Sequence, residues 1–452
     1  MSEQKNENKM GVMPVKKLIL SMSLPMMISM LVQAFYNVAD SLFVARVSED
    51  ALTAVTLAFP MQNLMIAVAT GTGVGINAVL SKALGEKNFD DANRSANTGI
   101  LLTVIHYLIF LAVALFFTVP FVLSQTSDGS ITGFAVSYIG IVTMSSFGCF
   151  FQLTFERLLQ STGRTILSMI SQITGAVINI ILDPILIFGL FGFPRLETAG
   201  AAIATVIGQS CAALTAFFLN VKYNKEISLS VKEIIRPAKY IVKKIYFVGV
   251  PSILMVSIGS LMTYLMNVLL VTFSSTAQAV FGAYFRLQSF FFMPVFGLNN
   301  GLIPVLAYNY GARNKERINE ALRFAIILAA AIMCAGTLVM EAIPVQLLQL
   351  FEASDHMLEI GVPALRIIAL HFPVAAVCIA LGSVFQAFSR SYYSLIVSLG
   401  RQLVILIPVA WLLSLSGVLN NIWWAFPIAE IMSFILTIIF YSRVKRTVVS
   451  VL

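Results

Sequence analysis

Two stretches decide how this chain folds: FYNVADSLFV at residues 35–44 and VINIILDPILIF at residues 177–188. Each places one carboxylate, Asp40 or Asp183, inside a long apolar run. An ionised side chain at the centre of a membrane costs about 2.5–3.5 kcal/mol on insertion scales, so such a group usually faces a cavity rather than lipid. The two stretches therefore predict membrane helices whose acidic side chains bind something.

The composition is that of a helical membrane protein. Of the 452 residues, 58% are hydrophobic and only 11% are charged, and the mean hydropathy is +0.89. Apolar runs long enough to cross a bilayer recur along the whole chain. We expect an all-α integral membrane protein with twelve spans, at residues 18–44, 52–82, 97–122, 131–160, 165–190, 198–221, 245–273, 278–309, 320–345, 358–388, 391–416 and 421–442.

The basic residues predict the orientation. The net charge of +8 could suggest a nucleic-acid partner, but the Lys and Arg residues lie mainly in the gaps between apolar runs. The gaps on the side of the two termini hold 24 of them, and the opposite gaps hold only Arg46 and Arg195. Because loops rich in Lys and Arg stay in the cytoplasm, we expect a multi-pass protein of the cell membrane with both termini cytoplasmic and no nucleic-acid partner.

The second half repeats the first at a constant offset of 226 residues. Pairs at this offset include Pro25 and Pro251, Gln62 and Gln288, Gly71 and Gly297, and Gln160 and Gln386. Six spans per half is an even number, so the halves share one orientation and are related by a pseudo-two-fold axis along the membrane normal. The predicted parts are a cytoplasmic tail 1–17, an N-lobe 18–221, a basic cytoplasmic connector 222–244, a C-lobe 245–442 and a tail 443–452. The connector is either an amphipathic helix on the inner leaflet or a solvated linker.

Oxygen-bearing side chains accompany both aspartates. Asn179 lies four residues before Asp183 and therefore on the same helical face, and Tyr36 and Asn37 precede Asp40 by one turn. Pro184 cannot donate to the carbonyl of Ile180, which frees one backbone oxygen. Carboxylate, amide and carbonyl oxygens suit Na⁺, and a carboxylate in a low-dielectric cavity can also exchange a proton near neutral pH. The alternative is that either aspartate only hydrogen-bonds a neighbouring helix.

Further residues are candidates for a cavity that takes organic molecules. Thr205 in AGAAIATV is a possible extra ligand for the cation, and the segment FRLQSFFFMPVFGLNNG is rich in aromatic residues. Aromatic faces attract organic cations, and Met adapts to many shapes. The candidates for the substrate cavity are Tyr36, Asn37, Met61, Arg286, Gln288, Phe292 and Met293.

Several classes of protein are disfavoured. The four cysteines lie inside spans at irregular spacing, which argues against a disulfide framework, and the three histidines have no metal-ligand spacing. No phosphate-binding loop and no nucleophile with a base at a recognisable spacing is present, so neither an enzyme nor an ATP-driven pump is expected. We expect no cofactor beyond a coupling ion and no ATPase subunit.

Five motifs together resemble the multidrug and toxin extrusion (MATE) family. They are SLPMMISMLVQAFYNVADSLFVARV at 23–47, ALTAVTLAFP at 51–60, LLQSTGR at 158–164, INIILDPILIFG at 178–189 and GAAIAT at 200–205. The details are closest to the bacterial branch of MepA-like drug exporters. The resemblance implies two six-helix bundles in a V shape and cation-driven export of varied drugs. It also places the cation site of the amino-terminal lobe on Asp40, Asn179, Asp183 and Thr205, where cation binding is expected to bend the first span.

One departure from the family is informative. Some members carry an acidic residue on the seventh span, whereas residues 245–273 contain none, which favours coupling through the first lobe alone. We therefore expect a monomeric antiporter that works by alternating access and exports drugs or toxic metabolites, often cationic and aromatic, in exchange for H⁺ or Na⁺. The alternative is an exporter of a lipid-linked precursor or of a single dedicated metabolite, which would favour a strongly cationic cavity.

Overall fold

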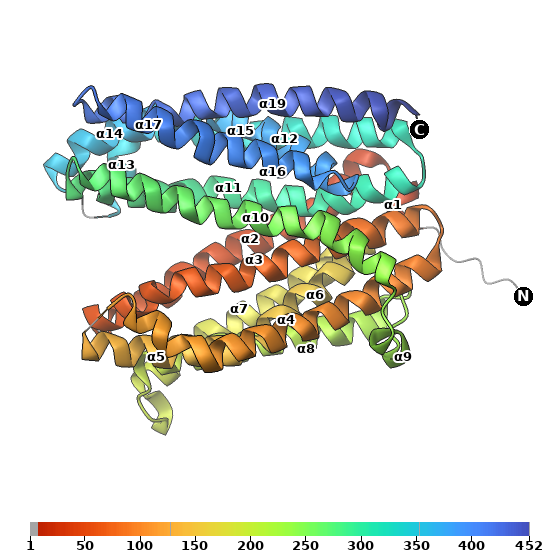
Figure 1. The fold of residues 1–452 in the computed structure, drawn as a ribbon, viewed down its shortest axis with the longest axis horizontal. Coiled ribbons are helices and arrows are strands. Elements are labelled where there is room, and N and C mark those ends of the chain that lie inside the picture. Colours follow the sequence, from red (N-terminus) through yellow and green to blue (C-terminus); the bar gives the residue numbers. More distant parts are fainter. Residues whose placement is uncertain (1–7, 127, 352, 452) are drawn as a thin grey trace, which may run out of the picture. The chain divides into compact units, whose positions relative to one another are not determined.

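The computed structural model describes residues 8–126, 128–351 and 353–451, and within them the fold is all-α, as predicted (Figure 1). Part of the predicted tails, residues 1–7 and 452, lies outside the described residues. The helices of the first half are α1 Lys9–Val12, α2 Val15–Ala45, α3 Glu49–Gly85, α4 Phe89–Leu123, α5 Gly129–Met144, α6 Phe147–Ser161, α7 Thr165–Phe188, the 3₁₀ turn η1 Leu190–Gly192, α8 Glu197–Tyr223 and α9 Val231–Ile235. Those of the second half are α10 Lys239–Val271, α11 Ser275–Gly311, α12 Lys315–Ala342, α13 Pro344–Gln349, α14 Asp355–Ala369, α15 Phe372–Ala387, α16 Ser391–Leu399, η2 Gly400–Leu406, α17 Ile407–Ser414, α18 Leu419–Ile422, α19 Ala425–Thr447 and η3 Val449–Val451.

The chain forms two compact units. Unit 1 comprises Asn8 and Ile28–Ile253, and unit 2 comprises Lys9–Met27 and Leu254–Leu452. Two helices are therefore divided between units: α2 at Met27 and α10 at Ile253, each two residues after a proline. The predicted lobes 18–221 and 245–442 follow the membrane spans, whereas these units follow packing, which can differ between the two ends of a long helix.

The repeat of 226 residues extends to the helix boundaries. The first residues of four helix pairs are separated by this offset, and two matched N-caps, Ser48 with Ser274 and Asn88 with Asn314, each accept a hydrogen bond from a backbone N–H three residues later. Such caps satisfy N–H groups that the first helical turn leaves unpaired. The matched starts are Glu49 and Ser275, Phe89 and Lys315, Gly129 and Asp355, and Thr165 and Ser391.

Ten helices among the described residues are long and apolar enough to cross a membrane, and twelve crossings result if two bent pairs each count as one. The pairs are α5 with α6, bent by 43°, and α14 with α15, bent by 45°. Pro373 near the start of α15 removes a backbone donor, which ends the preceding helix. Between α5 and α6 the sequence Ser145-Ser146-Phe147-Gly148 supplies the Ser and Gly residues that often accompany kinks. The expected fourth and tenth spans are therefore broken helices.

The basic connector is held against α4 rather than forming one long helix. Within residues 222–244 only α9 and the ends of α8 and α10 are helical. The buried Asn97 of α4 donates to the carbonyl of Ser228 at 2.9 Å and to the Glu233 carboxylate at 2.8 Å, and it accepts from the Ser230 N–H at 2.9 Å. These contacts fix the connector to unit 1.

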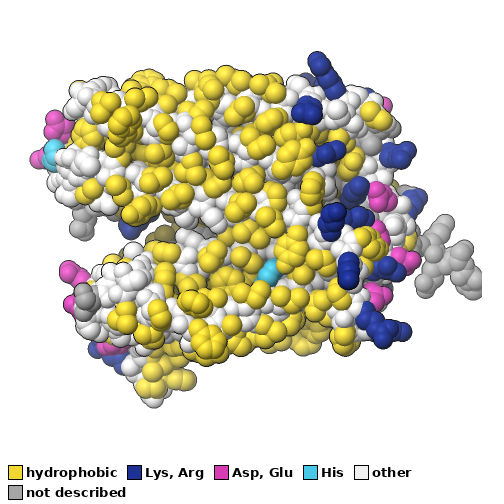
Figure 2. All heavy atoms as spheres, viewed as in Figure 1, with side chains coloured by type: hydrophobic (Ala, Val, Ile, Leu, Met, Phe, Trp, Pro, Cys, Tyr) yellow, Lys and Arg dark blue, Asp and Glu magenta, His cyan; other side chains and the backbone are white. Residues whose placement is uncertain are grey.

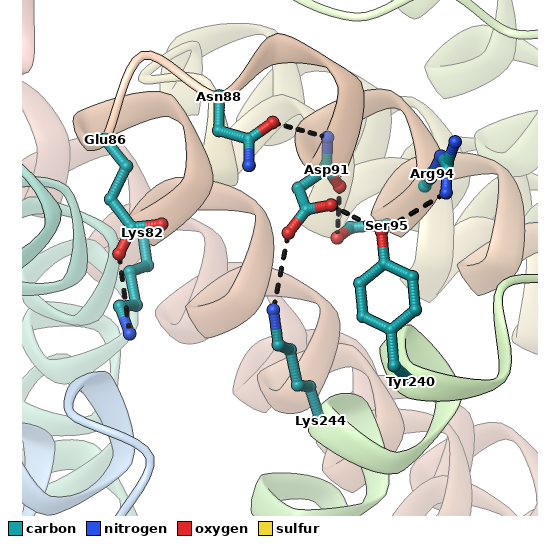
Figure 3. Close-up of polar contacts among 8 residues, drawn as sticks. All are labelled: Lys82, Glu86, Asn88, Asp91, Arg94, Ser95, Tyr240 and Lys244. Atoms are coloured by element: carbon teal, nitrogen blue, oxygen red, sulfur yellow. Dashed lines mark hydrogen bonds and ion pairs between the residues drawn. The ribbon is translucent and has the colours of Figure 1, made fainter.

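A second set of contacts joins the first turns of α4 and α10 (Figure 3). The Tyr240 hydroxyl donates to Asp91 Oδ1 at 2.6 Å, and Lys244 Nζ lies 3.3 Å from Asp91 Oδ2. The Asp91–Lys244 pair is partly exposed, so it contributes at most about 1 kcal/mol. Figure 2 shows Lys and Arg side chains gathered at the helix ends near α9, with hydrophobic side chains covering the middle of the helices.

Candidate cation site and substrate cavity

Two helices of unit 1, α7 and α8, approach each other unusually closely. A Cβ atom added to Gly175 would lie 2.8 Å from the Gly208 carbonyl oxygen, and one added to Gly208 would lie 2.8 Å from the Gly175 carbonyl oxygen. Small residues at four-residue intervals let membrane helices touch in this way. On α8 they are Gly200, Ala204, Gly208 and Ala212.

This close approach brings three predicted site residues together. Asn179 Nδ2 lies 3.4 Å from Asp183 Oδ1 on its own helix and 3.4 Å from Thr205 Oγ1 on α8. All three side chains are buried, and Asp183 is fully inaccessible. Pro184 follows Asp183 inside α7, so one backbone N–H is missing from this turn.

The half-buried Asp40 comes from the part of α2 that belongs to unit 1. It lies close enough to Asp183 for the two carboxylates to interact electrostatically. Tyr36, one turn earlier, lies near the Thr205 side chain and within electrostatic range of both carboxylates. Asn37 is exposed, since its position on α2 turns it away from this group.

Three buried oxygens in this group have no hydrogen-bond partner: Asp40 Oδ1, Asp183 Oδ2 and Asn179 Oδ1. A buried acceptor without a partner costs about 1–3 kcal/mol, and more when it is charged. All three atoms accept hydrogen bonds, so a water molecule, a proton on a carboxylate or a bound cation would satisfy them. The oxygen donors fit a hard cation such as Na⁺ as well as a proton.

A small polar cavity adjoins these residues. It has a volume of about 70 Å³ and is lined by Gln33, Tyr36, Gln152, Gln172, Gly175, Ala176, Asn179, Thr205, Gly208 and Gln209. The four glutamines come from four different helices, and Gln172 Nε2 donates to Gln33 Oε1 at 3.1 Å. Sequence reasoning missed these glutamines, because an isolated amide on a helix carries no pattern that marks it as part of a site.

Unit 2 contains a much larger cavity, of about 580 Å³. A stripe on α11 forms one wall with Phe285, Gln288, Phe292, Phe296 and Asn299. Two other candidates on α11, Arg286 and Met293, are not among the lining residues. Residues three or four positions apart share one helical face, and these two lie on other faces of α11. Met61 lies in unit 1, where it packs against the hydrophobic core.

The ion pair between Arg401 and Glu430 lines the unit 2 cavity. Arg401 Nη1 lies 3.1 Å from Glu430 Oε2; the arginine side chain is 32% exposed and the glutamate only 3%. Arg401 lies in the π-helical segment η2, a type of distortion often found at functional sites. Four buried polar atoms that belong to lining residues have no partner: Tyr284 Oη, Asn299 Oδ1, Gln386 Oε1 and Thr437 Oγ1.

The two cavities occupy corresponding positions of the repeat. Six of the residues that line the small cavity have counterparts 226 positions later that line the large one: Gln33 and Gly259, Tyr36 and Met262, Gln152 and Cys378, Gln172 and Ser398, Gly175 and Arg401, and Ala176 and Gln402. The same architecture therefore holds a small polar site in unit 1 and a wide, aromatic cavity in unit 2. These features define a multi-pass membrane protein with a cavity inside each helical unit.

Comparison with known proteins identifies the family. A family model described as MatE matches residues 25–185 and 251–412, and the chain belongs to this family. The multidrug export protein MepA of Staphylococcus haemolyticus is 27% identical over 435 residues, covering 96% of this chain and 95% of that protein. A FAD transporter of Shewanella oneidensis is 27% identical, covering 93% of this chain and 92% of that protein.

A solved structure has the same fold. An outward-facing MATE family transporter of the MOP superfamily aligns with a TM-score of 0.90 at 26% identity, covering 98% of this chain and 99% of that chain. The resemblance to the MATE family inferred from sequence motifs, and to MepA-like exporters within it, is thereby confirmed. The named relatives are transporters rather than enzymes.

Proposed function

We propose that this protein is a secondary active multidrug efflux antiporter of the cell membrane, coupled through Asp40, Asn179, Asp183 and Thr205. The observation that carries the proposal is the set of three unpartnered acceptor oxygens on Asp40, Asn179 and Asp183. Two nearby carboxylates repel each other when both are ionised, so uptake of H⁺ or Na⁺ relieves the repulsion. Cation binding and release then change the charge of the site by one unit in each transport cycle.

The large cavity of unit 2 supports a role in substrate binding. Its aromatic residues offer flat apolar surfaces, and Gln288 and Asn299 add hydrogen-bonding groups. Cavities of this size hold drug-sized ligands. The export of several drugs is also the activity for which the MepA relative is named. In this proposal the monomer works by alternating access with both termini in the cytoplasm.

The proposal predicts that efflux follows an imposed ion gradient. Purified protein in sealed vesicles should move ethidium when a pH gradient or a Na⁺ gradient of the correct sign is imposed, and it should stop when the gradient is collapsed. The measurement is ethidium fluorescence under each gradient applied separately. Efflux that persists without any ion gradient, or that requires ATP, would contradict the antiporter assignment.

A second candidate function is the export of one dedicated anionic metabolite. It is favoured by the Arg401 guanidinium, which is exposed to the unit 2 cavity and can bind a carboxylate or phosphate with two hydrogen bonds. The FAD transporter among the relatives agrees with this candidate. Both functions use the same cavity, so they differ in which compounds are moved.

The variant Arg401→Gln/Glu430→Gln separates the two functions. It removes both charges together, because removing one partner alone leaves a buried charge that costs about 3–5 kcal/mol. If the protein is a drug exporter, the double variant should keep ethidium efflux within about twofold. Wild-type vesicles should then move ethidium faster than FAD or a fluorescent lipid. Strong FAD efflux that the double variant loses, with no ethidium efflux in either protein, would establish the second function instead.

A further inference from the structure

Unit 1 contains a third buried acid, Glu156, which the proposed site does not include. It lies on α6 and is 3% exposed. Its Oε1 atom accepts a hydrogen bond from Gln152 Nε2 at 3.0 Å and one from Ser171 Oγ at 3.3 Å. Both partners are neutral, and the neighbouring Arg157 donates instead to Gln160 Oε1 at 2.9 Å. The other titratable or charged groups within electrostatic reach are Arg157 itself and the Cys149 thiol.

One hydrogen-bond partner connects Glu156 to the small polar cavity. Gln152 lines the cavity, whereas Ser171 of α7 does not. The same cavity is also lined by Asn179 and Thr205 of the cation site. A volume of about 70 Å³ between polar walls is enough for water molecules. The cavity thus borders both the cation site and Gln152, a hydrogen-bond partner of Glu156.

Glu156 lies toward the Lys- and Arg-rich end of unit 1. Its partner Ser171 precedes Asp183 by twelve residues on α7, which corresponds to about 18 Å along the helix axis. In that direction α7 begins at Thr165, next to Arg164, and α6 ends at Ser161. Along the axis of α7, Glu156 therefore lies between the cation site and this end of the unit.

The internal repeat indicates that the fold does not require an acidic residue at position 156. The counterpart of Glu156 in the second half is Gly382, and the counterpart of Gln152 is Cys378. Both counterparts line the large cavity of unit 2. The same helical arrangement therefore forms with no side chain at the position of Glu156. A buried carboxylate is costly, so its presence in unit 1 calls for a functional reason.

We propose that Glu156 is a proton relay between the cation site and the Lys- and Arg-rich end of unit 1. This inference rests on the proposed function and specifies it, because it makes H⁺ the coupling ion. A protonated water in the cavity gives its proton to the Glu156 carboxylate, which becomes neutral. The acid later returns that proton to water at the Lys- and Arg-rich end, and the carboxylate is restored.

The test uses the full-length protein in vesicles with a pH-sensitive dye inside. Glu156→Gln keeps the size and an acceptor oxygen but cannot carry the proton. We expect equilibrium binding of ethidium to be unchanged, whereas coupled efflux and proton movement fall about tenfold or more and lose their dependence on internal pH. Glu156→Asp should restore part of the rate. Gln152→Leu, which leaves the acid in place but makes one cavity wall apolar, should also slow proton movement.

The matched control is Thr154→Val on the same helix. Thr154 is buried and its hydroxyl lies 2.6 Å from that of Thr103, but it does not line the cavity. Wild-type rates and a wild-type internal-pH profile in Glu156→Gln would overturn the relay. An equal loss of coupled efflux and proton movement in Thr154→Val would also overturn it, because the loss in Glu156→Gln would then reflect a disturbed structure rather than a missing proton carrier. If wild-type efflux follows Na⁺ with no proton movement, the relay is wrong while the antiporter survives. If Asp183→Asn still couples, the cation site itself is wrong.

Discussion

Asp183→Asn is expected to abolish gradient-driven efflux while leaving the fold and drug binding nearly unchanged. The replacement has almost the same shape, and the amide oxygen can still accept from Asn179 Nδ2, which lies 3.4 Å from Oδ1 in the wild type. The charge, however, can no longer change as a cation comes and goes. The contribution of the membrane potential, about 2.3 kcal/mol per charge per 100 mV, is then lost to transport. Efflux should fall to the passive leak, a drop of about tenfold or more.

Two companion variants make this result specific. Asp40→Asn should behave in the same way, because Asp40 lies close enough to Asp183 to interact with its charge. Asp91→Asn is the control: its carboxylate also meets a partner, Lys244, but at the partly exposed start of α4 (Figure 3). It should change stability by less than about 1 kcal/mol and leave coupling intact. The coupling role fails if Asp183→Asn vesicles still concentrate ethidium against its gradient at the wild-type rate.

The all-helical fold and its internal repeat could be predicted from sequence because both depend on periodic, chain-wide signals. Hydropathy marks long apolar helices, and the offset of 226 residues recurs in the helix starts and N-caps. The breaks between α5 and α6 and between α14 and α15 could not be predicted, because hydropathy averages over the few residues that cause a bend. The division of α2 and α10 between the two units was missed for a related reason: it depends on contacts between distant segments.

The charged members of the candidate site could be predicted, but its amides could not. Asp40 and Asp183 stand out because a carboxylate in an apolar run is rare. Gln33, Gln152 and Gln209 lie on different helices, and only the fold brings them to one cavity. The Arg401–Glu430 pair could not be predicted, because it joins η2 to α19, and only the fold brings these segments together. Arg286 was predicted to line the substrate cavity but does not. It lies one position after Phe285 of the lining stripe, and neighbouring residues on a helix face different directions.

Gly208→Val is expected to disrupt the packing of α7 against α8 and with it the cation site. Even a Cβ atom at this position would lie 2.8 Å from the Gly175 carbonyl oxygen and 3.0 Å from Asn179 Cβ. Because the first of these contacts is with backbone, a side-chain rotation cannot relieve it, and the helices must separate. Overpacking of this kind costs about 1–3 kcal/mol or more, which outweighs the gain of less than about 1 kcal/mol from replacing a helical glycine. The thermal unfolding temperature should fall, and coupling should be lost in the protein that remains folded.

Gly140→Ala is the matched control for Gly208→Ala, because it makes the same change where space is available. Gly140 lies inside α5 of the same unit, and a Cβ atom there would meet nothing within 4 Å. Here only the helix propensity changes, so stability should rise by up to about 1 kcal/mol. Gly208→Ala should fall between the two variants, because its single methyl group makes the backbone contact without the two further methyl groups of valine. A Gly208→Val protein that melts at the wild-type temperature and still couples efflux to the gradient would contradict this prediction. In that case α7 and α8 need not approach this closely. The contacts of 3.4 Å from Asn179 to Asp183 and Thr205 would then not be required for the cation site.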